Sequence, residues 1–425
     1  MENPLTGPSS DGRVLFVSCG AHAIQDGLTA LQYVLLPILA QVFGLSYAQV
    51  GLLRGLSSIA MSSLEIPAGI MAERLGERPL LTFGMVCAGG GYLGVAHATG
   101  FTLIALAFFL TGIGAAFQHS LASSLLVQTF HGISRRRALG SYNACGDAGK
   151  LFFTASFSAA LGAGFAWNTI VTLLAGAAIG FALAAWLLLS RVGAGAAPRT
   201  HGNRNGEPLA APHTPSEHAA DNSGQKRRGR GWGIKEPKRF ALLGTLIFLD
   251  STVQAVFLTF LTFVLLDKGV DEAIAAGGVV LALTGGMVGK LCCGFLAAKL
   301  GDRNTFILVQ LTTLTAFGGV IALPAELLLL TLPVIGIFVQ GSSTVTYGAV
   351  ADFVTTDRQS RGYALIYTLS SAASVGGPFV FGLIADQWGL DGLLWTLIAV
   401  TMATIPPSIV LTTKANMAKS HQDQS

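Results

Sequence analysis

Long apolar segments constrain this chain more than any other feature of its sequence. A helix of roughly 20 apolar residues crosses the hydrocarbon core of a bilayer. Only 11% of the residues are charged, whereas a soluble domain carries about 25%. We therefore predict an all-α integral membrane protein with twelve transmembrane helices, which excludes a soluble enzyme and a nucleic-acid-binding domain. The twelve apolar windows lie at 14–38, 47–70, 79–97, 102–130, 138–163, 166–190, 240–265, 273–297, 304–323, 326–350, 361–385 and 389–412.

These windows form two sets of six, separated by a polar segment. Residues 191–239 are rich in Gly, Ala, Pro, Asn and Arg and show no apolar periodicity, which is typical of a flexible linker. The segment includes the basic run Lys226-Arg227-Arg228. We predict an N-terminal bundle at 1–190, a basic cytoplasmic linker at 191–239, a C-terminal bundle at 240–412 and a cytoplasmic tail at 413–425.

Basic residues are distributed unevenly between the two sides of the predicted bilayer. Most of the 26 Lys and Arg residues fall in the linker, the termini and the loops on that side. Because short loops rich in Lys and Arg stay in the cytoplasm, we expect cytoplasmic termini in a multi-pass protein of the bacterial inner (plasma) membrane. None of the five cysteines forms a CxxC or a Cys/His ligand spacing. Apolar packing is therefore their expected role, and no metal site is predicted.

The loop after the second window recurs after the eighth. Residues 69–78 read GIMAERLGER, and residues 294–303 read GFLAAKLGDR. Both glycines, the leucine and two cationic positions align at a constant offset. Such an internal repeat predicts two related halves, which is common among secondary transporters.

Two sets of six windows, a long basic central loop and this repeated motif resemble the major facilitator superfamily over nearly the whole chain. The resemblance implies two pseudo-symmetric six-helix bundles around a central cavity that opens alternately to each side of the membrane. It also implies that the motif stabilises the outward-facing state, through glycines that allow close helix approach and charged residues at the bundle seam. These residues are Gly69, Glu73, Arg74, Arg78, Gly294, Lys299, Asp302 and Arg303.

A narrower resemblance concerns the first two windows. The segments AHAIQD at 21–26, Leu36-Pro37 and FGLSYAQVGLL at 43–53 are similar to the fosmidomycin-resistance type of efflux permease. That type implies drug or organic-anion export by proton antiport. The antiporter signature of the fifth window ends in Gly-Pro, whereas this chain has GDAGK at 146–150.

Several charged residues lie inside the windows, where each costs about 2.5–3.5 kcal/mol and needs a partner, water or a function. Asp26 lies near the middle of the first window, with His22 four residues earlier on the same helical face. Asp250 takes nearly the same place in the seventh window. We predict that these three residues couple transport to protons. The alternative for His22 and Asp26 is a structural hydrogen bond to a neighbouring helix.

In the fifth window, Asp147 and Lys150 are three residues apart and face the same side of the helix. They either neutralise each other or exchange partners when an anionic solute binds Lys150. Other polar residues are predicted to line the substrate cavity, with snorkelling to water as the alternative for the arginine. They are Arg54, Gln118, His119, Gln340 and Tyr367.

Glu65 in the second window aligns with Lys290 in the eighth at the offset of the repeat. An acid and a base at equivalent positions suggest an ion pair that joins the two bundles and holds one state of the transporter. The alternative is that each residue neutralises a neighbour within its own bundle.

Motifs for ATP-driven transport and for catalysis are missing from the sequence. Gly149-Lys150 and Gly289-Lys290 lack the earlier glycine of a phosphate-binding loop. We therefore expect a monomeric secondary transporter, not an enzyme, that moves a small organic solute across the bilayer without ATP or a cofactor. Proton-coupled efflux is the main hypothesis, and proton-coupled uptake of a small organic anion is the alternative. An intramembrane enzyme or a membrane sensor is the alternative from a different class.

Overall fold

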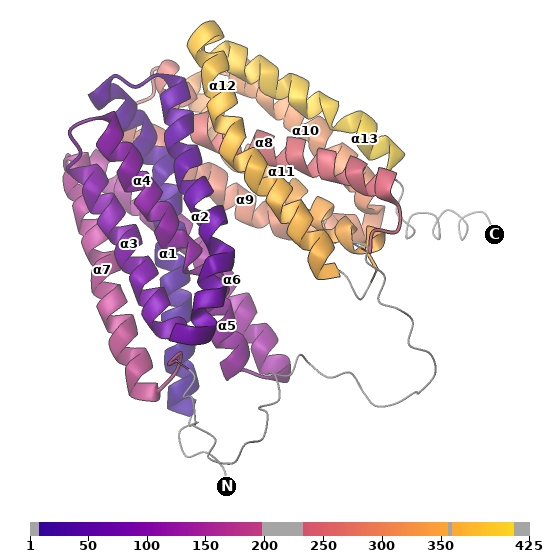
Figure 1. Ribbon diagram of the computed structural model, residues 1–425. Coiled ribbons are helices and arrows are strands. Elements are labelled where there is room, and N and C mark those ends of the chain that lie inside the picture. Colours follow the sequence, from indigo (N-terminus) through magenta and orange to yellow (C-terminus); the bar gives the residue numbers. More distant parts are fainter. Residues whose placement is uncertain (1–7, 198–232, 356–358, 412–425) are drawn as a thin grey trace, which may run out of the picture.

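The computed structural model describes residues 8–197, 233–355 and 359–411, and nearly all of them are helical (Figure 1). The first six windows form seven helices, because the fourth window breaks at Phe117 and Gln118 into two helices. The N-terminal bundle comprises α1 (Pro8–Phe43), α2 (Tyr47–Leu75), α3 (Glu77–Ala96), α4 (Phe101–Ala116), α5 (His119–Thr129), α6 (Gly132–Gly162) and α7 (Trp167–Val192).

The last six windows form a second bundle. Its eleventh and twelfth windows share α12, within which the chain reverses at Gly389. The φ angle of this residue is 71°, a conformation that favours glycine. The bundle comprises α8 (Pro237–Asp267), α9 (Glu272–Leu300), α10 (Asp302–Ala322), α11 (Ala325–Phe353), α12 (Gln359–Ala403) and α13 (Ile405–Val410).

Nine helical segments of the described chain are long and apolar enough to cross a membrane. Helices α2 and α6 are not among them. These two helices carry four of the charged residues that the sequence places inside the windows, Arg54, Glu65, Asp147 and Lys150. These charged residues lower the mean hydropathy of the two helices.

The predicted linker lies largely outside the described residues. Helix α7 ends at Val192 and α8 begins at Pro237, whereas residues 198–232 and the predicted tail at 413–425 lie outside the described ranges. The predicted division into two bundles, a linker and a tail stays a prediction.

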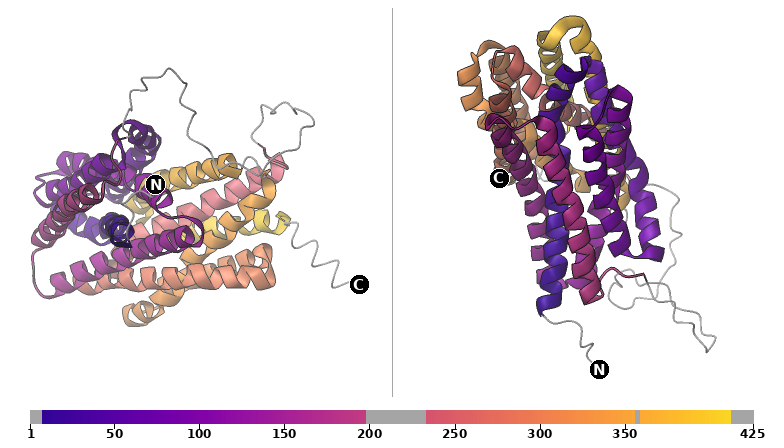
Figure 2. Two further views of the ribbon diagram at one scale, coloured as in Figure 1. Left: turned by 90° about the horizontal axis from the view of Figure 1, so that it is seen from below. Right: turned by 90° about the vertical axis from the view of Figure 1, so that its left-hand side faces the viewer.

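The two bundles meet near one end of the N-terminal helices and diverge toward the other end (Figures 1 and 2). At the closed end, α2 packs against α12 so tightly that a Cβ at Gly51 would lie 2.1 Å from the backbone oxygen of Pro378. Asp386 of α12 accepts hydrogen bonds from the backbone N–H groups of Tyr47 and Ala48 at 2.7 and 3.0 Å. The start of α1 and the end of α7 lie at the diverging end.

Candidate functional site

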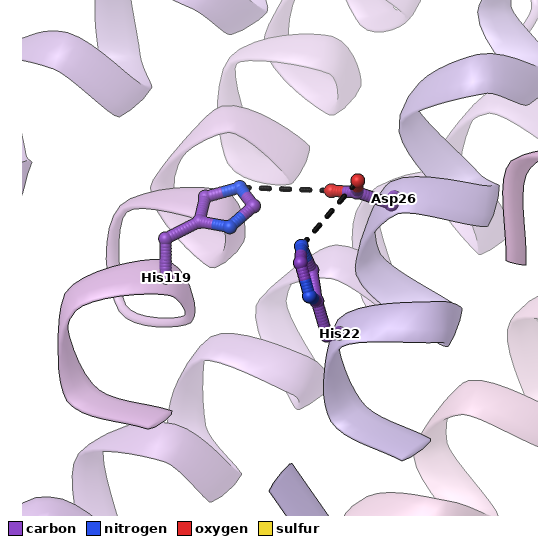
Figure 3. Close-up of side chains that lie close together, drawn as sticks. All are labelled: His22, Asp26 and His119. Carbon is purple, nitrogen blue, oxygen red and sulfur yellow. Dashed lines mark ion pairs between the residues drawn. The ribbon is translucent and has the colours of Figure 1, made fainter. Parts of the chain in front are cut away.

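A buried carboxylate in α1 is the centre of a cluster of cationic and imidazole groups (Figure 3). Asp26 Oδ2 lies 3.0 Å from Lys150 Nζ and 3.4 Å from His22 Nε2. Its other oxygen, Oδ1, lies 3.7 Å from His119 Nε2. Helices α1, α5 and α6 therefore bring four of the predicted residues to a single site.

Two glycines of α6 make this cluster possible. A Cβ at Gly149 would lie 2.0 Å from the backbone oxygen of Ala23, and one at Gly146 would lie 2.6 Å from the His22 ring. Because both positions lack a side chain, α6 rests directly against α1. Lys150 follows Gly149 on α6 and thereby reaches Asp26.

The cluster continues across the seam between the bundles. Lys150 Nζ donates to Asp147 Oδ1 at 3.0 Å, so these two residues are paired in this conformation. Lys290 of α9 donates to both oxygens of Asp147, at 3.2 and 3.3 Å. Negative and positive groups thus alternate from Asp26 to Lys290, and we call these four residues the ion network. Its last pair joins the N-terminal bundle to the C-terminal bundle.

This arrangement corrects the predicted pair of Glu65 with Lys290. Glu65 is exposed on α2 and is in none of the ion pairs of the described residues. The repeat makes α2 and α9 equivalent, but equivalent helices of the two bundles need not contact each other. Helix α2 packs against α12, and α9 packs against α6. Lys290 therefore meets an acid of α6.

A backbone carbonyl fixes the tautomer of His22. Nδ1 lies 2.8 Å from the backbone oxygen of Tyr142, which can only accept a hydrogen bond, so Nδ1 carries a hydrogen. A neutral ring would then direct the lone pair of Nε2 toward the Asp26 carboxylate at 3.4 Å. A proton shared by Nε2 and Oδ2 converts this repulsion into a hydrogen bond.

His22, Asp26 and His119 also offer three ligand atoms within 4.8 Å of one another. Two imidazoles and a carboxylate can bind a divalent transition metal. However, the Lys150 ammonium already lies 3.0 Å from the same carboxylate, and a metal ion would add a second cation beside it in a low-dielectric site. The donor set with Lys150 present fits a proton better than a metal ion.

Asp250 lies in a separate site of the C-terminal bundle and is 4% exposed. It accepts hydrogen bonds from Gln254 Nε2 at 2.8 Å, Gln310 Nε2 at 2.8 Å and Ser342 Oγ at 2.9 Å. In the part of the chain that the structure describes, no cation lies within ion-pair distance of this carboxylate. Its role in proton coupling stays a prediction.

Three other predicted cavity residues have mainly local contacts. Gln118 donates to the Tyr142 hydroxyl at 3.2 Å, and the Tyr142 ring stacks on His22. Gln340 donates to the backbone oxygen of Ala282, which ties α11 to α9. Tyr367 stacks on Tyr347 at 5.2 Å between ring centroids. Gln118 is thereby connected to Asp26 of the ion network, through Tyr142 and His22.

The loop motif of the N-terminal bundle has an acid that the sequence prediction missed. Glu77 is buried at the start of α3 and accepts hydrogen bonds from Ser124 and Gln128. Its place in the first turn of a helix, where carboxylates are favoured, was the available signal. Glu73 and Arg74 are exposed, and the guanidinium of Arg78 lies 4.9 Å from the centre of the Trp186 ring.

The matching motif of the C-terminal bundle lies at the junction of α9 and α10. Asp302 and Arg303 line an apolar pocket between α8, α10 and α11. Gly294 and Lys299 lie in the last two turns of α9. The gating role of both motifs stays a prediction.

Comparisons with known proteins agree with this architecture. A family profile described as Major Facilitator Superfamily matches residues 18–325 and 240–423. The 3-(3-hydroxy-phenyl)propionate transporter of Escherichia coli (strain K12) is 24% identical over 366 residues, which are 84% of this chain and 83% of that protein. The uncharacterized MFS-type transporter YfnC of Bacillus subtilis (strain 168) is 26% identical over 166 residues. This second match covers 38% of this chain and 40% of that relative.

Solved structures share the fold. A bacterial homolog of the human lysosomal transporter Spinster, in an inward-facing and unoccupied conformation, has a TM-score of 0.73 at 16% identity and covers 95% of this chain and 96% of its own. A variant of the nucleoside transporter NupG has a TM-score of 0.69 at 13% identity, over 96% of this chain and 99% of its own. The prediction of a twelve-helix membrane protein is confirmed. The chain belongs to the major facilitator superfamily, a family of multi-pass membrane transporters and not of enzymes.

Proposed function

We propose that this protein is a proton-coupled secondary transporter of a small organic solute that works by alternating access. The observation that carries the proposal is the ion network, which connects Asp26 and its neighbour His22 to Lys290 in the other bundle. A proton bound at Asp26 can thereby alter the contact between the two bundles, which must move relative to each other during transport.

The coupling follows from shared partners. When Asp26 is ionised, Lys150 is shared between Asp26 and Asp147. When Asp26 takes up a proton, the charge of Lys150 acts on Asp147 alone, so Asp147 attracts Lys290 less strongly. Protonation in the N-terminal bundle therefore weakens the seam.

We also propose that the described conformation is open to the cytoplasm. The distribution of Lys and Arg supports cytoplasmic termini in an inner membrane, and the bundles diverge at the end where α1 begins. The inward-facing solved relative supports the same assignment.

Proton-coupled efflux, the direction suggested by the first two windows, is the first candidate. Uptake of a small organic anion is the second. Two observations favour an anionic solute: the named substrate of the Escherichia coli relative is a carboxylate, and Arg54 lies in α2 without an acid in ion-pair distance among the described residues.

Purified protein in liposomes tests the proposal, with 3-(3-hydroxyphenyl)propionate and fosmidomycin as probes. A pH gradient should drive one probe in one direction, and that direction distinguishes efflux from uptake. Asp26→Asn should abolish gradient-driven movement but leave solute counterflow, because exchange needs no net proton transfer. Asp391→Asn, which removes an exposed carboxylate outside the network, is the matched control. Gradient-driven transport by Asp26→Asn at the wild-type rate would disprove the assignment.

A further inference from the structure

The two ends of the ion network differ in exposure. The side chains of His22 and Asp26 are only 9% and 12% exposed. The side chains of Lys150, His119 and Lys290 are 30%, 38% and 40% exposed. Lys290 belongs to the other bundle, so this more exposed end lies where the two bundles meet. A solute between the bundles can therefore reach the lysines, while the Asp26 carboxylate lies deeper in the N-terminal bundle.

The ion network carries no net charge when the histidines are uncharged. Asp26 and Asp147 contribute two negative charges, and Lys150 and Lys290 contribute two positive charges. Asp26 lies near the middle of the membrane-spanning segment 10–43, where an uncompensated charge is costly. Binding of an anion alone, or of a proton alone, would leave such a charge.

The groups in contact with Asp26 determine where a proton can bind. They are His22 from α1, His119 from α5 and Lys150 from α6. Tyr142, also from α6, stacks on the His22 ring. At neutral pH the lysine is already protonated and the phenol keeps its hydrogen. A proton taken up at this end is therefore held by Asp26 or by one of the two imidazoles, and in each case the network gains one positive charge.

Lys150 is the cation that this proton affects most. Its Nζ lies 3.0 Å from an oxygen of Asp26 and 3.0 Å from an oxygen of Asp147. The ammonium group has three hydrogens to donate, and its hydrogen bond to Asp26 weakens when the negative charge of that carboxylate is cancelled. The partly exposed Lys150 can then donate a hydrogen bond to an anion.

We propose that the ion network binds one proton and one singly charged organic anion together, with the anion on Lys150. This proposal rests on the proposed function, because it names the charge of the solute. The empty network and the network with both ligands are neutral, so the bundles can change orientation in both states without an uncompensated charge in the membrane. Proton and solute then move in the same direction, which corresponds to uptake of an organic anion.

Isothermal calorimetry on purified protein in detergent, without a gradient, tests this proposal. The probe is 3-(3-hydroxyphenyl)propionate, whose carboxylate is ionised above about pH 6, and its uncharged amide is the reference. Titrations in two buffers with different ionisation enthalpies count the protons taken up with the anion. At the alkaline end of the range, wild-type protein should take up about one proton per anion, and its affinity should fall about tenfold per pH unit. Binding of the amide should take up no proton.

Two substitutions separate the proton from the anion. Asp26→Asn removes the negative charge that the proton cancels, so it should bind the acid at about pH 8.5 as tightly as the wild type does at about pH 6, without proton uptake. Lys150→Met should bind acid and amide equally, and Lys150→Arg should retain part of the preference for the acid. Asp391→Asn and Arg191→Gln, at exposed positions, are the matched controls and should bind as the wild type does. Thermal unfolding of each variant shows that it is folded.

The outcomes distinguish this proposal from the proposed function. Release of a proton when the acid binds would show that proton and solute compete, which overturns joint binding but leaves proton-coupled transport intact. Equal binding of acid and amide by the wild type, unchanged binding by Lys150→Met, or no binding of either probe would overturn the anion site. If the acid binds with proton uptake but no pH gradient moves it across liposomes, the proposed function is wrong and the joint binding stands.

Discussion

Asp250 is a buried carboxylate with neutral partners, and its substitution gives a prediction at the scale of one residue. Its oxygens accept three hydrogen bonds from neutral donors, whereas an asparagine would set its own N–H groups against one or more of these donors. Asp250→Asn should therefore lower the free energy of unfolding by roughly 1–3 kcal/mol, measured as thermal stability in detergent. Asp391→Asn, at an exposed position, should have little effect. An unchanged stability combined with lost proton coupling would instead support a direct role in proton transfer.

Other side chains show how much of the site the sequence could predict. The pairs His22 with Asp26 and Asp147 with Lys150 follow from helical spacing, since residues three or four apart are neighbours. The contacts of Lys150 with Asp26 and of Lys290 with Asp147 join different helices, and spacing within one helix does not predict them. The carbonyl of Tyr142 that fixes the His22 tautomer is likewise a tertiary contact.

At the scale of helix pairs, the sequence repeat showed which helices are equivalent but not which helices are in contact. The motif at 69–78 and its copy at 294–303 correctly make α2 and α9 equivalent. Equivalence under pseudo-symmetry does not mean contact, however, so α2 meets α12 while α9 meets α6. Apolar periodicity could not indicate these partners, because lipid-facing and bundle-facing surfaces of a membrane helix are both apolar.

The contact of α1 with α6 depends on Gly149. A Cβ at this position would lie 2.0 Å from a backbone oxygen of α1, so the helices would have to separate. Gly149→Ala should lower the free energy of unfolding by roughly 1–3 kcal/mol and reduce gradient-driven transport. Gly176→Ala on α7 is the control, because a Cβ at that position would meet no atom within 4 Å, and it should be neutral or slightly stabilising. Equal effects of both substitutions would show that the close approach is unimportant.

The N-terminus of α2 is held across the seam by Asp386, whose carboxylate accepts two backbone hydrogen bonds. A carboxylate at a helix N-terminus is favoured by the helix dipole. Losing such a cap costs about 1 kcal/mol. Asp386→Ala should therefore lower the ratio of molecules with this end closed to molecules with this end open by roughly fivefold. Spin labels at Val42 and Trp388, both exposed, in a cysteine-free background would report longer distances. Asp391→Ala should leave the distances between the spin labels unchanged. If Asp386→Ala also leaves them unchanged, the hydrogen bonds of Asp386 do not hold this end closed.

At the scale of the whole molecule, the count and order of the spans followed from the apolar windows, because a bilayer sets the length of each helix. The angle between the bundles did not follow. A transporter with one sequence must populate at least two relative orientations of its bundles. No pattern in the chain therefore specifies a single orientation. The ion network at the seam is a feature of one such arrangement, and its partners can only be read from a structure.

The ion network predicts how two distant substitutions combine. Lys290→Met removes the last contact, between Lys290 and Asp147, and Asp26→Asn removes the charge at the other end. Each should abolish gradient-driven transport while solute counterflow persists, and Lys290→Arg should retain coupling. Because both residues act through Lys150 and Asp147, the double variant should be no worse than either single variant. The measurement is proton-to-solute stoichiometry in liposomes. If each single variant retains part of the coupling and the losses add in the double variant, the two ends act independently and the seam is not controlled by the proton.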